Sequence, residues 1–524
     1  MRRLCVLAAA FVTPALAQFA GLHTTQTGDA LYFSSPVRPA GSEKPFYSRI
    51  YRWNAQTGVQ IVAEVNDRDG GDCERIYYQL YEPQVSLDGS VWAYTGSGPV
   101  ASRSCSEREP NEGVIRAGPA NPTRRIAGRI ALSPNGRYAI SSTARAASGR
   151  YHLVTDLVSG LQSVVAGGSL GVQARVTNDG SLIDTESTAI FLASRTGETR
   201  VFPTEHPDVD DAVIDPGGSI IVYRTRLGPG RPARLSRIAV ATGVETSLAS
   251  GFGFSRPALS ADGRTLYFWE AGGDTLGFSS MSTSGGPVRR FNIPSADFAV
   301  SGDGRVAFLS TASGLVRVDL ETRETTVLVP PTPYLTNVYR GYEPSNVVAL
   351  GSSFQISGAV SGLRSVRLCG EPMTIQENQP SFVRLEAPWT LKEGDCDLVA
   401  SSASPFEHGL SVSVRVFDPL FVRNAVFNSQ YQYNSSSTPF RAGDLLIAYM
   451  TGLGPLAGGA LAQPGFSCQI GGLTATVEFA GAAPGYPGYY QINVRAPPGD
   501  PGFRSLSCGL PDAVRGTIGV WVAP

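Results

Sequence analysis

A short pattern of apolar and polar positions recurs along the first two-thirds of the chain. Alternating apolar residues lead to Ser or Thr, then to an Asp-Gly-like pair, then to a second alternating stretch. Clear copies occupy residues 82–94, 128–140, 172–184, 210–222, 256–268 and 296–308, and a weaker copy occupies 24–33. Asp-Gly and Asn-Gly favour the positive φ angles of a tight turn, and a period of two predicts strands. Each copy therefore predicts a β-hairpin, with turn glycines Gly28, Gly89, Gly136, Gly180, Gly218, Gly263 and Gly304.

A second predicted hairpin follows most copies, for example at 49–62, 190–202, 235–248 and 315–328, usually with a Thr-Gly turn. Two hairpins give four antiparallel strands per repeat, and a repeat of roughly 40–45 residues is typical of a propeller blade. Seven repeats therefore predict an all-β fold that begins with a seven-bladed β-propeller over residues 18–332. A long array of β-sandwiches is the alternative.

The repeat resembles that of TolB-type, PD40/WD40-like β-propellers. The family pattern P-x-x-S-x-D-G-x-x-x-x-F is matched best by Pro257, Ser260, Asp262, Gly263 and Phe268, and the resemblance covers about residues 24–330. It implies the fold but no single function, because such propellers serve peptidases, periplasmic scaffolds and sugar-binding proteins.

The repeat stops after Pro330, and two shorter modules follow. Residues 333–418 and 419–524 contain alternating stretches in a similar order, and each has two cysteines, which predicts two immunoglobulin-like β-sandwich domains. The first resembles IPT/TIG domains. The segments AGDLLIAYMTGLGP and IGGLTATVEFAGAAPGYPGYYQINVRAPP, which lie in the second, resemble the Solibacter-type C-terminal domain. That domain typically ends large exported proteins and has no established activity.

The N-terminus has the parts of a secretory signal. Arg2 and Arg3 precede an apolar stretch, and Ala15-Leu16-Ala17 forms a small-residue cleavage site. We therefore expect a signal peptide at 1–17, cleavage between Ala17 and Gln18, and a secreted, cell-surface or periplasmic protein. No later apolar run is long enough for a transmembrane segment.

Six cysteines remain after this cleavage, and an even number in an exported chain predicts disulfides. Sequence proximity and the domain borders favour three of the fifteen possible pairings, namely Cys73–Cys105, Cys369–Cys396 and Cys468–Cys508.

The long predicted connections lie at the end of the propeller opposite the Asp-Gly turns, at 34–48, 66–82, 96–112 and 224–236. Arginine can bind carboxylates or sulfates through two parallel hydrogen bonds. The candidate binding face there comprises Arg38, Arg103, Arg224, Arg226, Arg231 and Arg234. A solvated rim of mixed charge is the alternative.

Acidic side chains in one of these connections are weak candidates for calcium, because the segment lacks the EF-hand spacing. They are Asp67, Asp69, Asp72 and Glu74.

Composition argues against several functions. The chain has 43 Lys and Arg against 44 Asp and Glu, so no basic surface for nucleic acid is expected. Gly167 to Gly171 match G-x-S-x-G but lie between predicted strands, and the four histidines are scattered. We identify no catalytic, cofactor-binding or metal-binding residue beyond the calcium candidates, and we expect no cofactor.

The favoured hypothesis is an exported, non-catalytic binding or scaffold protein. Its propeller loops would recognise a protein or polysaccharide, and its immunoglobulin-like modules would serve as spacer or surface attachment. The alternative is a propeller enzyme, of lyase, lactonase or glycosidase type, with its site at the central channel.

Overall fold

The structure, a computed structural model, describes most of the chain after the predicted signal peptide, which lies outside the described residues. The described ranges are 19–42, 48–64, 79–97, 111–117, 123–143, 151–166, 175–186, 188–205, 208–226, 232–251, 254–272, 275–340, 343–360, 362–511 and 515–524. The chain divides into two compact units, Met1–Val37 with Tyr47–Pro331, and Arg38–Phe46 with Thr332–Pro524. Across the described ranges, no helix is long and apolar enough to cross a membrane.

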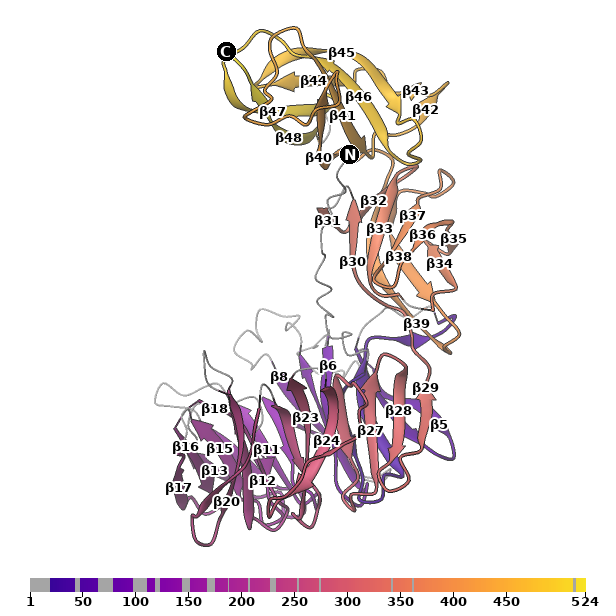
Figure 1. The fold of residues 1–524 in the computed structure, drawn as a ribbon. Helices are drawn as coiled ribbons and strands as arrows, with labels where there is room; N and C mark the ends of the chain where they lie inside the picture. Colours follow the sequence, from indigo (N-terminus) through magenta and orange to yellow (C-terminus); the bar gives the residue numbers. More distant parts are fainter. Residues whose placement is uncertain are drawn as a thin grey trace. The chain divides into compact units, whose positions relative to one another are not determined.

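In the first unit, the described residues form seven four-stranded antiparallel sheets, and the strands of each sheet pair in chain order (Figure 1). Sheet 1 contains β1 (Ala20–Thr24), β2 (Ala30–Ser35), β4 (Arg49–Asn54) and β5 (Gly58–Ala63). Sheet 2 contains β6 (Gln79–Val85), β7 (Val91–Ser97), β8 (Asn111–Ala117) and β9 (Arg124–Ala127). Sheet 3 contains β10 (Arg129–Leu132), β11 (Tyr138–Thr143), β12 (Tyr151–Asp156) and β13 (Gln162–Ala166).

The remaining four sheets follow the same plan. Sheet 4 contains β14 (Arg175–Val176), β15 (Leu182–Glu186), β16 (Ala189–Ala193) and β17 (Thr199–Pro203). Sheet 5 contains β18 (Val209–Ile214), β19 (Ile220–Thr225), β20 (Ala233–Ala239) and β21 (Glu245–Gly251). Sheet 6 contains β22 (Phe254–Leu259), β23 (Thr265–Gly272), β24 (Thr275–Ser282) and β25 (Arg289–Arg290). Sheet 7 contains β26 (Asp297–Val300), β27 (Val306–Thr311), β28 (Gly314–Asp319) and β29 (Thr325–Val329).

The recurrent Ser-x-Asp-Gly pattern forms the turn between the first two strands of a sheet. In sheet 6, Ser260 Oγ donates to Asp262 Oδ1 at 2.6 Å, and Asp262 Oδ1 accepts the Arg264 N–H at 3.0 Å. Ser260 Oγ also accepts the Thr265 N–H, at 3.0 Å, and Gly263 takes the positive φ of 69°. These hydrogen bonds, that from Ser260 above all, lower the pKa of Asp262. The Ser, Asp and Gly of the pattern each have a hydrogen-bond partner inside the turn, which explains why the pattern recurs from repeat to repeat.

The first turns of neighbouring sheets are joined to one another. Gln26 N–H donates to Leu87 O at 2.7 Å between sheets 1 and 2, and Asp303 N–H donates to Gln26 O at 2.9 Å between sheets 7 and 1. Similar hydrogen bonds join sheets 2 and 3, 3 and 4, 4 and 5, and 6 and 7. Sheets 5 and 6 share an apolar cluster that includes Val222 and Leu235 of sheet 5 and Phe254 and Phe268 of sheet 6. The seven sheets therefore form a closed ring, which is the architecture of a β-propeller.

The second unit begins with a module in which two sheets share one apolar core (Figure 1). One sheet contains β30 (Tyr334–Arg340), β31 (Glu343–Ser345), β33 (Ser353–Ala359), β36 (Ile375–Asn378) and β37 (Phe382–Glu386). The other contains β3 (Arg38–Pro39), β32 (Val347–Ala349), β34 (Ser365–Leu368), β35 (Glu371–Pro372), β38 (Gly394–Ser401) and β39 (Phe406–Arg415). We call this the middle module.

The C-terminal module has its own core, separate from that of the middle module. Its strands pair as one nine-stranded sheet. They are β40 (Leu420–Asn428), β41 (Leu445–Thr451), β42 (Leu456–Ala457), β43 (Ala460–Leu461), β44 (Ser467–Ile470), β45 (Leu473–Ala482), β46 (Tyr490–Arg495), β47 (Gly502–Gly509) and β48 (Arg515–Val522). The sheet closes on itself, because the Phe440 N–H near its start donates to Trp521 O in β48 at 2.9 Å.

Each module of the second unit contains one disulfide. Cys369 is bonded to Cys396, and Cys468 to Cys508. These are two of the three pairings that the sequence favoured, while Cys73 and Cys105 lie outside the described residues.

Candidate functional site

The two ends of the ring differ in the length of their connections. The first two strands of every sheet are separated by five residues, as at 86–90 and 260–264. At the opposite end the chain uses much longer connections, as between β5 and β6 and between β7 and β8. Short turns that hydrogen-bond to one another have no freedom to reshape around a ligand. The end with the long connections is therefore the candidate recognition face.

Arg224 and Arg226 lie at this end, where β19 finishes. Asp210, at the start of β18, forms ion pairs with both, and its Oδ1 lies 2.6 Å from Arg226 Nε. The hydrogen bond and charge of Asp210 raise the pKa of Arg226, whose side chain is 74% exposed. Arg224 also donates to Phe254 O in the next sheet. Arg226 thus presents a fixed cation to solvent, whereas Arg224 is held between two sheets.

Arg234 lies on β20 of the same sheet, and its N–H donates to Thr225 Oγ1 at 3.2 Å. Three of the six predicted arginines therefore share sheet 5. Arg103 and Arg231 lie outside the described residues, as do the calcium candidates Asp67, Asp69, Asp72 and Glu74. Within the described ranges, no group of three or more His, Cys, Asp or Glu side chains is placed to hold a metal ion.

Arg38 belongs to the second unit and is buried, and this corrects the sequence interpretation, which assigned it to the exposed binding face of the propeller. Arg38 is in β3, which pairs with β39 in the middle module. Its buried guanidinium lies 3.0 Å from Glu407 Oε1, and Arg367 contacts the other oxygen of that carboxylate at 3.0 Å. A buried cation held by a buried carboxylate is not available to a ligand. Arg38 is therefore a structural residue of the second unit.

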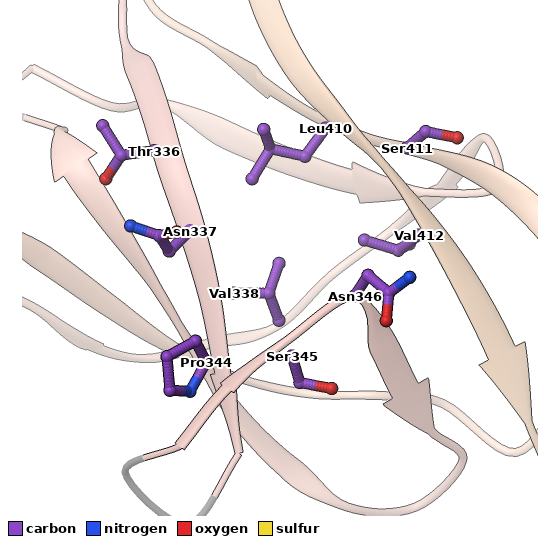
Figure 2. A pocket seen from close by; sticks show the side chains of 9 residues that line it. All are labelled: Thr336, Asn337, Val338, Pro344, Ser345, Asn346, Leu410, Ser411 and Val412. Atoms are coloured by element: carbon purple, nitrogen blue, oxygen red, sulfur yellow. The ribbon is translucent and has the colours of Figure 1, made fainter.

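A groove of about 380 Å³ opens in the middle module (Figure 2). Buried Val338 of β30 and Val412 of β39 line it, together with hydroxyl and amide side chains such as those of Thr336, Asn346 and Ser411. None of its nine lining residues is charged or is a histidine or cysteine, so the groove offers hydrogen bonds and apolar contact but no acid or base.

The ring also contains a buried polar pair that the sequence did not suggest. His152 of β12 in sheet 3 faces Asp184 of β15 in sheet 4, with 3.7 Å between Nε2 and Oδ2. Both side chains are buried, so this pair lies between neighbouring sheets and not at a surface. The two residues are separated by 32 positions on different repeats, and no local motif links them.

No protein-family model and no curated protein matches the chain. Among solved structures, hydrazine synthase of Kuenenia stuttgartiensis matches 57% of this chain and 95% of its own, with 12% identity and a TM-score of 0.38. TolB of Acinetobacter baumannii matches 57% of this chain and 79% of its own, with 15% identity and a TM-score of 0.34. The propeller domain of the trilobed protease of Pyrococcus furiosus matches 60% of this chain and 96% of its own, with 11% identity and a TM-score of 0.42. Because these identities and TM-scores are low, the propeller assignment rests on the strand pairing and ring closure described above and not on the matches.

Proposed function

We propose that the protein is an exported binding or scaffold protein, built from a seven-bladed TolB-like propeller and two immunoglobulin-like modules. The propeller recognises a protein or polysaccharide with the end that carries the long connections. The observation that carries this proposal is the difference between the two ends of the ring. At the other end the turns are short and hydrogen-bond to one another. A rigid ring that presents long connections at one end is a common design for recognition.

The disulfides support the proposed location outside the cytoplasm. Disulfides persist in oxidising compartments and are rare in the cytosol, where thiols are kept reduced. Cys468 and Cys508 are fully buried in the core of the C-terminal module, and they lie opposite each other on the paired strands β44 and β47. Two such bonds favour a compartment in which disulfides persist.

Arg226 and Arg264 allow a matched test of the recognition face. Both guanidiniums are exposed, at 74% and 86%, and each pairs with an aspartate of its own sheet. They lie at opposite ends of the ring, because Arg226 follows β19 whereas Arg264 lies in the first turn of sheet 6. We expect Arg226→Ala to weaken binding of the ligand about tenfold, the loss typical of one charged hydrogen bond, and Arg264→Ala to leave it unchanged.

The ligand is sought first by screening the full mature chain against secreted proteins and polysaccharides from its source. The affinities of the two variants are then compared by calorimetry. Equal losses for both variants, or a loss for Arg264→Ala alone, would contradict the assigned face. Cleavage of a screened polysaccharide would contradict the non-catalytic hypothesis and favour the propeller enzyme.

A further inference from the structure

Aromatic side chains gather on the outer surface of the C-terminal module. In β41 the inward positions Leu446, Ala448 and Met450 are buried in the core, and Tyr449 lies on the opposite face of the sheet. The contacts of Tyr449 with other rings are edge to face, at 6.3 Å from Phe427 and 6.4 Å from Tyr486.

Two more tyrosines extend this surface from the segment after β40. Tyr433 lies 6.2 Å from Phe427, also edge to face. Burial, and then the neighbouring Tyr431, raise the pKa of Tyr449. We call Phe427, Tyr431, Tyr433, Tyr449 and Tyr486 the tyrosine face. Tyr431 and Tyr486 are 61% and 62% exposed. Clustered aromatic side chains that remain so exposed mark an interaction surface, because the module's core is complete without them.

Amide side chains lie beside these rings on the same face of the sheet. Gln491 of β46 is directly opposite Tyr449 in the strand register, and its Nε2 donates to Asn493 Oδ1 at 2.9 Å. The Tyr433 hydroxyl donates to Asn424 Oδ1 at 3.1 Å. Phenols and amides both donate and accept hydrogen bonds without carrying charge at neutral pH.

The charged side chains at the edge of this face neutralise each other. Arg495 of β46 and Glu478 of β45 form an ion pair, so these two residues add no net charge to the face. A neutral partner that is rich in hydroxyl or amide groups matches such a surface.

The segment that carries Tyr431 and Tyr433 is held in shape before any ligand binds. Asn428 Oδ1 accepts the N–H groups of Gln430 at 3.0 Å and Gln432 at 2.9 Å. Beyond the tyrosines, Asn434 Oδ1 accepts the Trp521 N–H at 2.7 Å. Both ends of the segment are thus anchored, which reduces the entropy lost when a ligand orders the rings.

From this combination we propose that the tyrosine face binds a neutral polysaccharide. Sugar rings present flat C–H surfaces that pack on aromatic rings, and hydroxyl edges that match amides and phenols. An apolar helix of a partner protein would offer these amides no further hydrogen bonds, and an acidic glycan would meet the Glu478 carboxylate beside Arg495. This site lies in the second unit and does not depend on the recognition face proposed for the propeller.

The test uses the full mature chain and native affinity electrophoresis in gels that contain a neutral β-glucan, a mannan or starch. Alginate, an anionic polysaccharide, serves as the comparison. We expect retardation by at least one neutral polysaccharide and none by alginate. We expect the double variant Tyr431→Ala/Tyr486→Ala to weaken that retardation at least tenfold in dissociation constant.

Phe503→Ala is the matched control, because Phe503 is a similarly exposed aromatic residue of the same module, at 60%, but lies on β47. It should bind like the native chain, as should Arg226→Ala, so that failure of the propeller proposal and failure of this one are distinguishable. Circular dichroism of each variant checks that the module still folds. A Tyr431→Gln/Tyr486→Gln variant, which keeps polar side chains but removes the rings, should lose binding equally.

Three results would overturn the proposal. The first is that no neutral polysaccharide retards the native chain. The second is that the double variant is retarded as strongly as the native chain. The third is that the native chain dimerises in sedimentation and the double variant does not, since the face would then be covered by a second copy.

Discussion

At the scale of single residues, His408 shows how burial sets a pH dependence. Its ring is packed 4.4 Å from that of Tyr334, and its Nδ1 accepts the Leu335 N–H at 3.0 Å. Nδ1 can accept only when it carries no proton, and burial lowers the pKa of His408 to about 3. The unfolded chain has an ordinary histidine pKa near 6.5. Between pH ~6.5 and ~3 it therefore binds a proton at this residue that the folded chain does not bind.

This difference predicts that acid destabilises the second unit through His408. The stability is fully present above pH ~6.5, and it falls by about 1.4 kcal/mol per pH unit below that value until the folded pKa is reached. Between pH 6.5 and 5 the native chain should therefore lose about 2 kcal/mol more than His408→Asn, whose Oδ1 can accept the Leu335 N–H. Urea unfolding at the two pH values measures this. Parallel losses in the two proteins would show that His408 does not titrate on unfolding.

At the scale of elements, two turns of the ring distinguish the effect of the local backbone from the effect of packing between sheets. Gly136 and Gly160 both lie in sheet 3 and have positive φ angles of 69° and 74°. An added Cβ at Gly136 would lie 2.9 Å from Ser86 Cβ in the neighbouring sheet, whereas none of the atoms around Gly160 lies within 4 Å of such a Cβ.

The pair predicts different costs for the same substitution. Gly160→Ala should cost about 1 kcal/mol, from the left-handed backbone alone. Gly136→Ala adds a clash between two sheets and should cost roughly 1–3 kcal/mol more. Chemical denaturation of the propeller measures both, and equal costs would mean that the first turns do not pack against their neighbours.

The contrast between local and long-range contacts also explains how much of the fold and of the candidate site could be predicted from the sequence. The repeated hairpins were predictable because each Ser-x-Asp-Gly turn contains its own hydrogen-bond partners within five residues. The position of Arg38 was not, because its partner Glu407 lies 369 residues away. The tyrosine face was missed for a similar reason, since its aromatic residues come from three separate segments that only the strand pairing brings together.

At the scale of the whole molecule, the ring closes although no strand from the start of the chain joins the last sheet. All four strands of sheet 7 come from the end of the first unit, so sheet 7 and sheet 1 are joined only by contacts between sheets. The side chain of Asp297 makes one of them, since its Oδ2 accepts the Gly21 N–H at 2.7 Å. Trp53 and Phe308 make another, with ring centroids 5.6 Å apart.

Asp297→Ala should therefore loosen both sides of the closure at once. Removal of the carboxylate leaves the Gly21 N–H without this acceptor, at a cost of about 1–3 kcal/mol. Because β1 and β26 support each other, their amide protons should exchange about tenfold faster or more, while those of β15 in sheet 4 keep their native rates. The control is Asp262→Ala, whose carboxylate is hydrogen-bonded within its own turn and should affect only sheet 6. Hydrogen exchange read by mass spectrometry distinguishes the outcomes. Faster exchange confined to β26 would mean that sheet 1 is stable without sheet 7, and that the ring is held together by its other contacts.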